Sequence, residues 1–136
     1  MPHLTSTEIA GRIEDLYGAG LADLEAHAEA QPPGMLSALL GMHGALALAE
    51  RSILFHQDRL ARFIHSDRYV SSYEVSHLLD ASRRLAEAVA VRDVQAMSAA
   101  AVLQSLAPAP VPRPEPALSP PPPAPPLPAQ GPAYSR

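Results

Sequence analysis

Histidine and carboxylate side chains are the groups in this chain whose spacing could bind a metal ion. A di-iron site in a helical bundle uses two Glu-x-x-His repeats and two further glutamates. Glu74 and His77 form one such repeat, and the sequence contains no second one. Glu74 also stands three residues after Ser71, where a carboxylate caps a helix start. The chain contains no cysteine, which excludes thiolate metal sites, disulfides and cysteine nucleophiles. We therefore predict no metal and no other cofactor.

Hydroxyl nucleophiles lie near one histidine but lack the surroundings that catalysis needs. Ser71, Ser72 and His77 are close in sequence, yet no glycine turn of the nucleophile-elbow type surrounds them. The sequence also contains no phosphate-binding loop and no dinucleotide-binding fingerprint. We therefore expect no catalytic residues, no small-molecule substrate and a protein that is not an enzyme.

Arginine and aromatic side chains gather between residues 55 and 73. This composition is typical of the hot spots of protein–protein interfaces. We expect four apolar side chains of the region to form an exposed patch: Leu60, Phe63, Ile64 and Leu78. The predicted partner-binding residues are Arg59, Leu60, Arg62, Phe63, Ile64, Arg68, Tyr69, Tyr73 and Leu78. The predicted function is that of a small interaction or scaffold protein, which binds a second copy of itself or another helical protein.

Two other interpretations of this region stay open. In the first, Phe63, Ile64 and Leu78 close the end of a helical bundle and the arginines are solvated. In the second, Arg59 and Arg62 contact phosphates, and the chain is an accessory nucleic-acid-binding or regulatory protein of a bacterial mobile element. A net charge of −4 without a basic block argues against indiscriminate nucleic-acid binding.

Three helices must position these residues, over about residues 6–30, 34–66 and 72–106. Pro32 and Pro33 end the first helix and Pro108 ends the third, since proline lacks the backbone N–H that a helix interior requires. The turns are short, so consecutive helices should pack antiparallel. The sequence therefore predicts an all-α fold, a three-helix antiparallel bundle.

Two capping boxes mark the starts of the first and third helices. Thr5 precedes Glu8 by three residues, and Ser71 precedes Glu74 by the same spacing. In such a box the hydroxyl and the carboxylate each accept a hydrogen bond from the other residue's backbone N–H. These pairs predict helix starts directly after Thr5 and Ser71.

Apolar residues recur every seven positions in the second helix, which is typical of coiled-coil packing: Leu39, Leu46, Ile53 and Leu60. Polar residues interrupt the same arc at His43, Glu50 and Gln57. A carboxylate on a packed face needs a partner, and Arg92 lies less than one turn from the level of Glu50 on the third helix. We therefore predict a Glu50–Arg92 ion pair that sets the helix register.

The first helix is shorter than the second. When residues are paired symmetrically about the first turn, Ile9 lies beside Phe55 of the second helix. The first helix should therefore cover the second only as far as about Phe55. The tip of the hairpin formed by the second and third helices, about residues 56–80, should then stay uncovered.

The chain divides into a helical body, residues 1–107, and a Pro-rich tail, residues 108–136. From Pro108 to Pro132, 13 of 25 residues are proline, and no helix propagates through such a segment. We expect a disordered tail that acts as a flexible or semi-rigid spacer. A polyproline ligand for an aromatic groove is the alternative.

The sequence favours a soluble, cytoplasmic protein. Its N-terminus lacks the basic region and apolar stretch of a signal peptide. The longest uncharged stretch near the core, Ala30–Ala49, is interrupted by Pro32, Pro33 and Gly34. The remaining Met35–Ala49 is shorter than the about 20 residues that span a bilayer.

Two stretches, Leu46–Phe63 and Asp67–Val75, carry a resemblance to other proteins. Together they resemble segments of short helical proteins from GC-rich, actinomycete-type bacteria, over about residues 5–105. The resemblance implies the source and the fold, and it implies no activity, cofactor or site residue.

Overall fold

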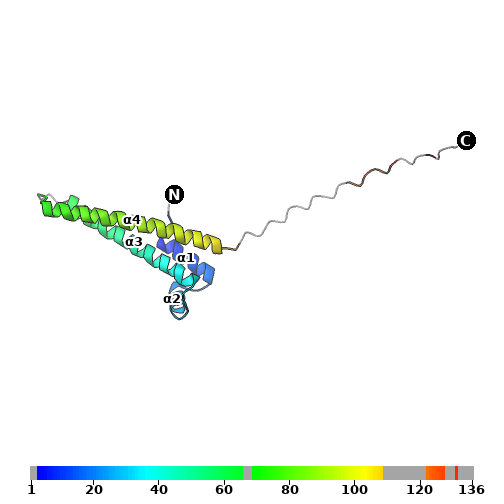
Figure 1. Cartoon of the computed structure of the whole chain (residues 1–136), viewed down its shortest axis with the longest axis horizontal. Coiled ribbons are helices and arrows are strands. Elements are labelled where there is room, and N and C mark those ends of the chain that lie inside the picture. The colour runs from blue at the N-terminus through cyan, green and yellow to red at the C-terminus, as the bar shows by residue number, and fades with distance from the viewer. Residues whose placement is uncertain (1–2, 66–68, 109–121, 128–130, 132–136) are drawn as a thin grey trace.

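A computed structural model of the chain describes residues 3–65, 69–108, 122–127 and 131. These residues are all-α: they hold four helices and no strand. The helices are α1 (Ser6–Tyr17), α2 (Leu21–Glu29), α3 (Met35–Ile64) and α4 (Ser72–Leu106). Figure 1 shows α3 and α4 side by side as a long hairpin, with α1 and α2 against the end where α4 finishes. We call that end the base and the other end, where α3 leads to α4, the tip.

The predicted helix over residues 6–30 is wrong, because the chain breaks between α1 and α2. Gly18 adopts the left-handed conformation (φ 70°, ψ 24°) and donates its N–H to the Glu14 carbonyl at 2.7 Å. Glycine takes this conformation without steric cost and so ends helices. The Glu14 carboxylate then accepts the N–H of Leu21, the first residue of α2, at 3.0 Å. The turn is therefore built as a stop for one helix and a start for the next.

Both predicted capping boxes are confirmed. The Glu8 carboxylate accepts the Thr5 N–H at 2.7 Å, and the Thr5 hydroxyl accepts the Glu8 N–H at 3.2 Å. Ser71 and Glu74 make the same pair of bonds at 2.9 and 3.2 Å. The bonds from Thr5, backbone first, lower the pKa of Glu8 below its ordinary value. These local bonds set the first residues of α1 and α4.

The hydrophobic core lies at the base, where all four helices meet. Its buried residues are Ile9, Ile13, Leu24, Leu39, Leu46, Ala96, Ala99 and Leu103. The predicted seven-residue repeat of α3 is buried at Leu39, Leu46 and Ile53. Toward the tip the buried α4 residues are alanines, Ala81 and Ala88. Since alanine buries little apolar area, the tip is held by less hydrophobic stabilisation than the base.

Two glycines, one inside α1 and one directly after it, allow a matched test of the helix stop. Gly18→Ala should lower the free energy of unfolding by about 1 kcal/mol, because a Cβ is strained in the left-handed conformation. Gly11→Ala should raise it by about 0.5–1 kcal/mol, because alanine is the better helix former. The Cβ at residue 11 meets no atom within 4 Å. Urea unfolding followed by circular dichroism measures both, and equal effects of the two substitutions would contradict the stop at Gly18.

Candidate interaction surface

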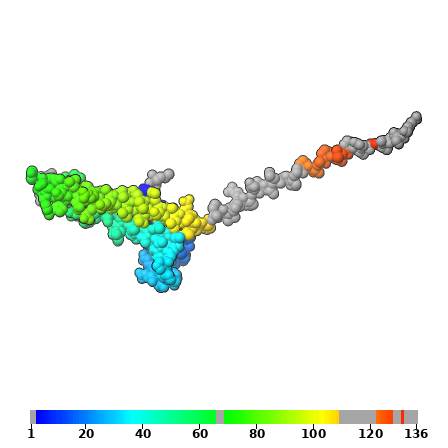
Figure 2. All heavy atoms as spheres, viewed as in Figure 1, coloured from blue at the N-terminus to red at the C-terminus, as the bar shows by residue number. Residues whose placement is uncertain are grey.

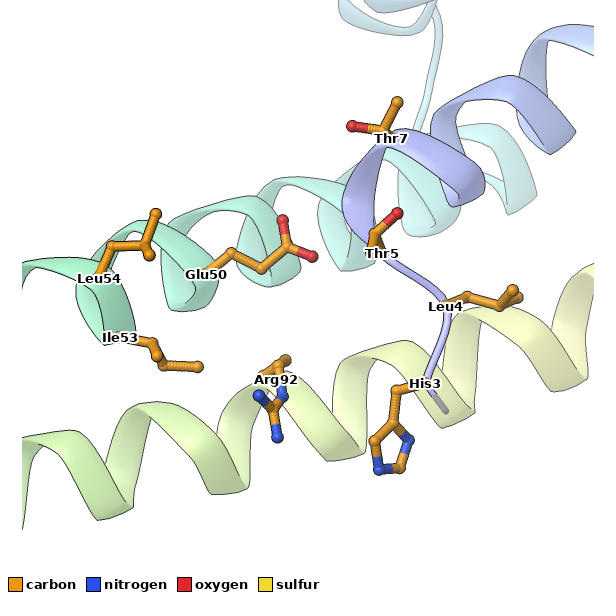
Figure 3. Close-up of a pocket in the computed structure, with 8 residues that line it drawn as sticks. All are labelled: His3, Leu4, Thr5, Thr7, Glu50, Ile53, Leu54 and Arg92. Atoms are coloured by element: carbon orange, nitrogen blue, oxygen red, sulfur yellow. The ribbon is translucent and has the colours of Figure 1, made fainter. Parts of the chain in front are cut away.

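Glu50 of α3 holds the start of α1. Its carboxylate accepts the backbone N–H of Ser6 at 2.8 Å, and its other oxygen accepts the Ser6 hydroxyl. Ser6 is the first residue of α1, so its N–H has no partner inside the helix. The negative charge also lies at the positive end of the α1 dipole. Figure 3 shows the Glu50 side chain extending from α3 toward α1.

The predicted Glu50–Arg92 ion pair is wrong, although both residues border the same pocket. Arg92 pairs instead with Asp93 of its own helix, with Nη2 and Nε each 2.9 Å from Oδ1. Asp93 Oδ1 also lies 3.5 Å from His3 Nε2. The reason is the level at which α1 begins. Its first turn lies beside Glu50, and the otherwise unpaired N–H of Ser6 donates to the Glu50 carboxylate. Glu50 therefore sets the position of α1 and forms no bridge to α4.

A pocket of about 590 Å³ lies at the N-terminal end of α1, where the layer formed by this helix over the hairpin finishes; we call this place the step. Its lining comes from the segment before α1, from the first turn of α1, from α3 and from α4, as Figure 3 shows. The lining residues are His3, Leu4, Thr5, Thr7, Glu50, Ile53, Leu54 and Arg92. Beyond this step the hairpin continues to the tip without a third helix (Figure 1). The uncovered part thus begins near Leu54 on α3, slightly closer to the base than expected.

On α3, the face that α1 covers continues toward the tip. Residues separated by multiples of seven lie on the same side of the hairpin, because the buried positions of α3 repeat at that interval. Leu54 follows the core-packed Leu40 by 14 residues, and Ile64 follows Glu50 by 14. Leu54 and Ile64 are 67% and 74% exposed. They extend the α1 side of α3 as uncovered apolar surface.

The matching side of α4 carries two more exposed apolar residues. Val75 precedes the buried Ala96 by 21 residues, and Leu79 precedes Asp93, the contact of His3, by 14. Val75 and Leu79 are 42% and 63% exposed. We call Leu54, Ile64, Val75 and Leu79 together the tip face. The residues seven positions away from these four, in the columns formed by the seven-residue repeat, are uncharged: Gln57, Ala61, Ser82 and Ala86.

The predicted apolar patch is only partly exposed. Ile64 is exposed, whereas Leu60, Phe63 and Leu78 are half-buried. Leu60 continues the buried series of α3 and therefore faces α4. Leu54, Val75 and Leu79 were not among the predicted residues, although their spacing from Leu40, Ala96 and Asp93 was present in the sequence. What was lacking was the side of the hairpin that α1 covers.

The polar and aromatic residues predicted for partner binding fall around the tip. Tyr69 and Tyr73 are exposed. The Tyr73 and His77 rings pack edge to face, with 4.4 Å between their centroids. Arg59 is half-buried, and the exposed Arg62 pairs with Asp58 at 2.8 Å. Arg68 lies outside the residues that the structure describes.

Charged residues of both hairpin helices cluster near the tip. The Arg84 guanidinium donates to Asp80 at 3.0 Å and thereby lowers the pKa of Asp80. The charges of Arg59 and Arg83 lower it further. Arg59 on α3 therefore belongs to the same cluster of charges as Asp80 on α4.

The opposite side of the hairpin also exposes apolar side chains, among them Leu48 and Val91. A shallow groove of about 290 Å³ runs between α3 and α4 on that side, bordered by Leu48, Arg84 and Val91. Figure 2 shows the slender hairpin extending alone toward the tip, past the thicker base.

Two further findings concern metal binding and membrane spans in the described part of the chain. In residues 3–65, 69–108, 122–127 and 131, no group of three or more His, Asp or Glu side chains could hold a metal ion. One helix among these residues, α3, is long and apolar enough to cross a membrane, with a mean hydropathy of 1.3. The core helix of a soluble protein has the same length and composition, so this helix alone is weak evidence for a membrane span.

No family model matches the chain, and no curated protein or solved structure matches it. The resemblance to proteins of actinomycete-type bacteria therefore stays a prediction.

Glu50→Gln tests the anchoring of α1. The amide keeps the shape of the carboxylate but loses its charge, so we expect unfolding free energy to fall by about 1–2 kcal/mol, as for hydrogen bonds to charged groups. Glu25→Gln, at an exposed position of α2, is the control and should change it by less than about 0.5 kcal/mol. Urea unfolding provides the measurement. If the two variants are equally stable, Glu50 does not anchor α1.

Proposed function

We propose that this chain is a small, soluble, non-enzymatic protein–protein interaction protein of the bacterial cytoplasm, and that it self-associates through the tip of the α3–α4 hairpin. Its body acts as an antiparallel bundle of the predicted three-helix type, with the first helix divided into α1 and α2. The tip face is the observation that carries the proposal. It is apolar, uncharged and continuous with the surface that α1 already covers.

The magnitude of the apolar surface favours a second copy as the partner. Removing the exposed parts of the four tip-face side chains from water contributes about 4–7 kcal/mol per copy, at about 1.5–3 kcal/mol for each fully buried side chain. Association costs about 4–15 kcal/mol in lost translational and rotational freedom. One tip face against a polar partner therefore barely offsets the cost. Two tip faces against each other contribute about 8–14 kcal/mol, which offsets all but the upper end of that cost.

The Pro-rich tail fits a tether in this proposal. α4 ends at Leu106, and Pro108 borders a pocket with Arg12 and Leu16 at the base. The tail therefore starts at the end of the body opposite to the tip. A polyproline spacer is stiff and extended, so it can hold the self-associating body away from an attachment point.

Nucleic-acid binding, the alternative function, gains no specific support. Arg62 and Arg84 are each paired with an aspartate four residues away. An arginine that is neutralised by a neighbouring carboxylate contributes little to phosphate binding, which depends on the release of counterions by net positive charge.

Leu79→Ser tests self-association through the tip face. Leu79 is 63% exposed, so the serine should leave folding intact while it removes an apolar contact in each copy. We expect the dissociation constant of the full chain, measured by sedimentation equilibrium, to rise at least about tenfold. Leu48→Ser, at a 58% exposed position on the opposite side of the hairpin, is the matched control and should leave the constant unchanged.

Two outcomes would contradict the proposal. A wild-type chain that stays monomeric at millimolar concentration does not self-associate. A loss of association in Leu48→Ser but not in Leu79→Ser would place the contact on the opposite side.

A further inference from the structure

We propose that two copies pair by an antiparallel two-fold arrangement, in which the tip of each hairpin lies on the tip face of the other and points at the start of the other's α1. This inference rests on the proposed self-association and adds its geometry. It assigns Leu54 of one copy to contact Ile64 of the partner subunit. It also places Leu79 near the two-fold axis, close to Leu79 of the partner subunit.

The first argument is the intramolecular contact that already exists. At the base, α1 forms one layer of helix over the α3–α4 hairpin and buries Ile9 and Ile13 completely. The same columns of α3 and α4 continue into the tip face, where no described helix covers them. A layer one helix thick could therefore cover the tip face in the way that α1 covers the base. The hairpin of a second copy supplies a layer of that thickness.

The second argument excludes the parallel arrangement. Each copy carries α1 on the same side of the hairpin as its tip face. If two copies faced each other with their tips at the same end, their α1 helices would meet. Packed helices need about 8–10 Å between axes, so two intervening helices would hold the tip faces out of contact. With the tips at opposite ends, each tip occupies the half of the surface that α1 leaves free.

The third argument is the register along α3. The partner's tip cannot pass the start of α1, which Glu50 and Ser6 fix. Leu54 borders the pocket at that step, and Ile64 is the last residue of α3. Placing Leu54 opposite Ile64 of the partner subunit puts the two-fold axis midway, at the level of Arg59. Arg59 precedes the end of α3 by five residues, and Leu79 follows the start of α4 by seven. Both therefore lie about 8–11 Å from the tip, and Leu79 falls near the axis.

The size of this contact predicts its strength. Ten residues of helix are about 15 Å long and two helices are about 20 Å wide, so each copy contributes a footprint of roughly 300 Å². Stable complexes bury about 800 Å² per partner. The pairing therefore belongs to the weak, concentration-dependent class, and disulfide trapping suits its detection.

Cysteine cross-linking tests the geometry, because the chain contains no natural cysteine. Full-length Leu54→Cys and Ile64→Cys chains are mixed under mild oxidation, and the two chains are distinguished by mass. The mixed disulfide should exceed either self-disulfide at least tenfold, since a disulfide requires Cα atoms within about 7 Å and two Leu54 positions lie about 15 Å apart along the axis. A mixture of Leu48→Cys with Ile64→Cys is the control. Leu79→Cys alone should form a self-disulfide.

The outcomes separate this inference from the proposed function. If light scattering shows dimers, but the Leu54–Ile64 disulfide forms no more than the Leu48–Ile64 control, the antiparallel pairing is wrong and self-association stands. If the wild-type chain and all variants stay monomeric, both proposals fail. Circular dichroism of each variant establishes that the helices are intact.

Discussion

The contact between the Glu50 carboxylate and the first turn of α1 decides how the rest of the molecule is divided. It satisfies the orphan N–H of Ser6 and places a negative charge at the positive end of the α1 dipole. Because Ser6 is the first residue of α1, this helix covers the hairpin only from the level of Glu50 toward the base. The hairpin is thereby separated into a base that α1 covers and a tip that it does not.

Hydrophobic burial follows the same division. At the base, Ile9, Ile13, Leu39 and Leu46 are the largest fully buried side chains. Near the tip the packing between α3 and α4 relies on small residues such as Ala81, and leucine and isoleucine side chains stay exposed. Regions with few buried apolar groups open most readily, and a partner that binds the folded state stabilises them by mass action. The tip is thus the part of the described body with the least hydrophobic stabilisation, and the proposed second copy would stabilise it most.

Local chemistry in the sequence predicted the helix starts, whereas the site depended on tertiary register. Thr5 with Glu8, and Ser71 with Glu74, are self-contained motifs, so both capping boxes were predicted correctly. The stop at Gly18 was overlooked within a helical apolar pattern. The partner of Glu50 was predicted wrongly, because Ser6 and Glu50 are 44 positions apart and meet only through packing. The all-α class needed no such register and was predicted correctly.

Amide hydrogen exchange at two protein concentrations tests the central claim most directly. If the uncovered tip takes a second copy, exchange of backbone amides in residues 54–64 and 75–86 should slow as concentration rises from micromolar to millimolar. Exchange at the base, around Ile9 and Leu39, should not change, because α1 covers that end in the single chain. Slower exchange at high concentration that is confined to the base, or no change anywhere, would contradict the account.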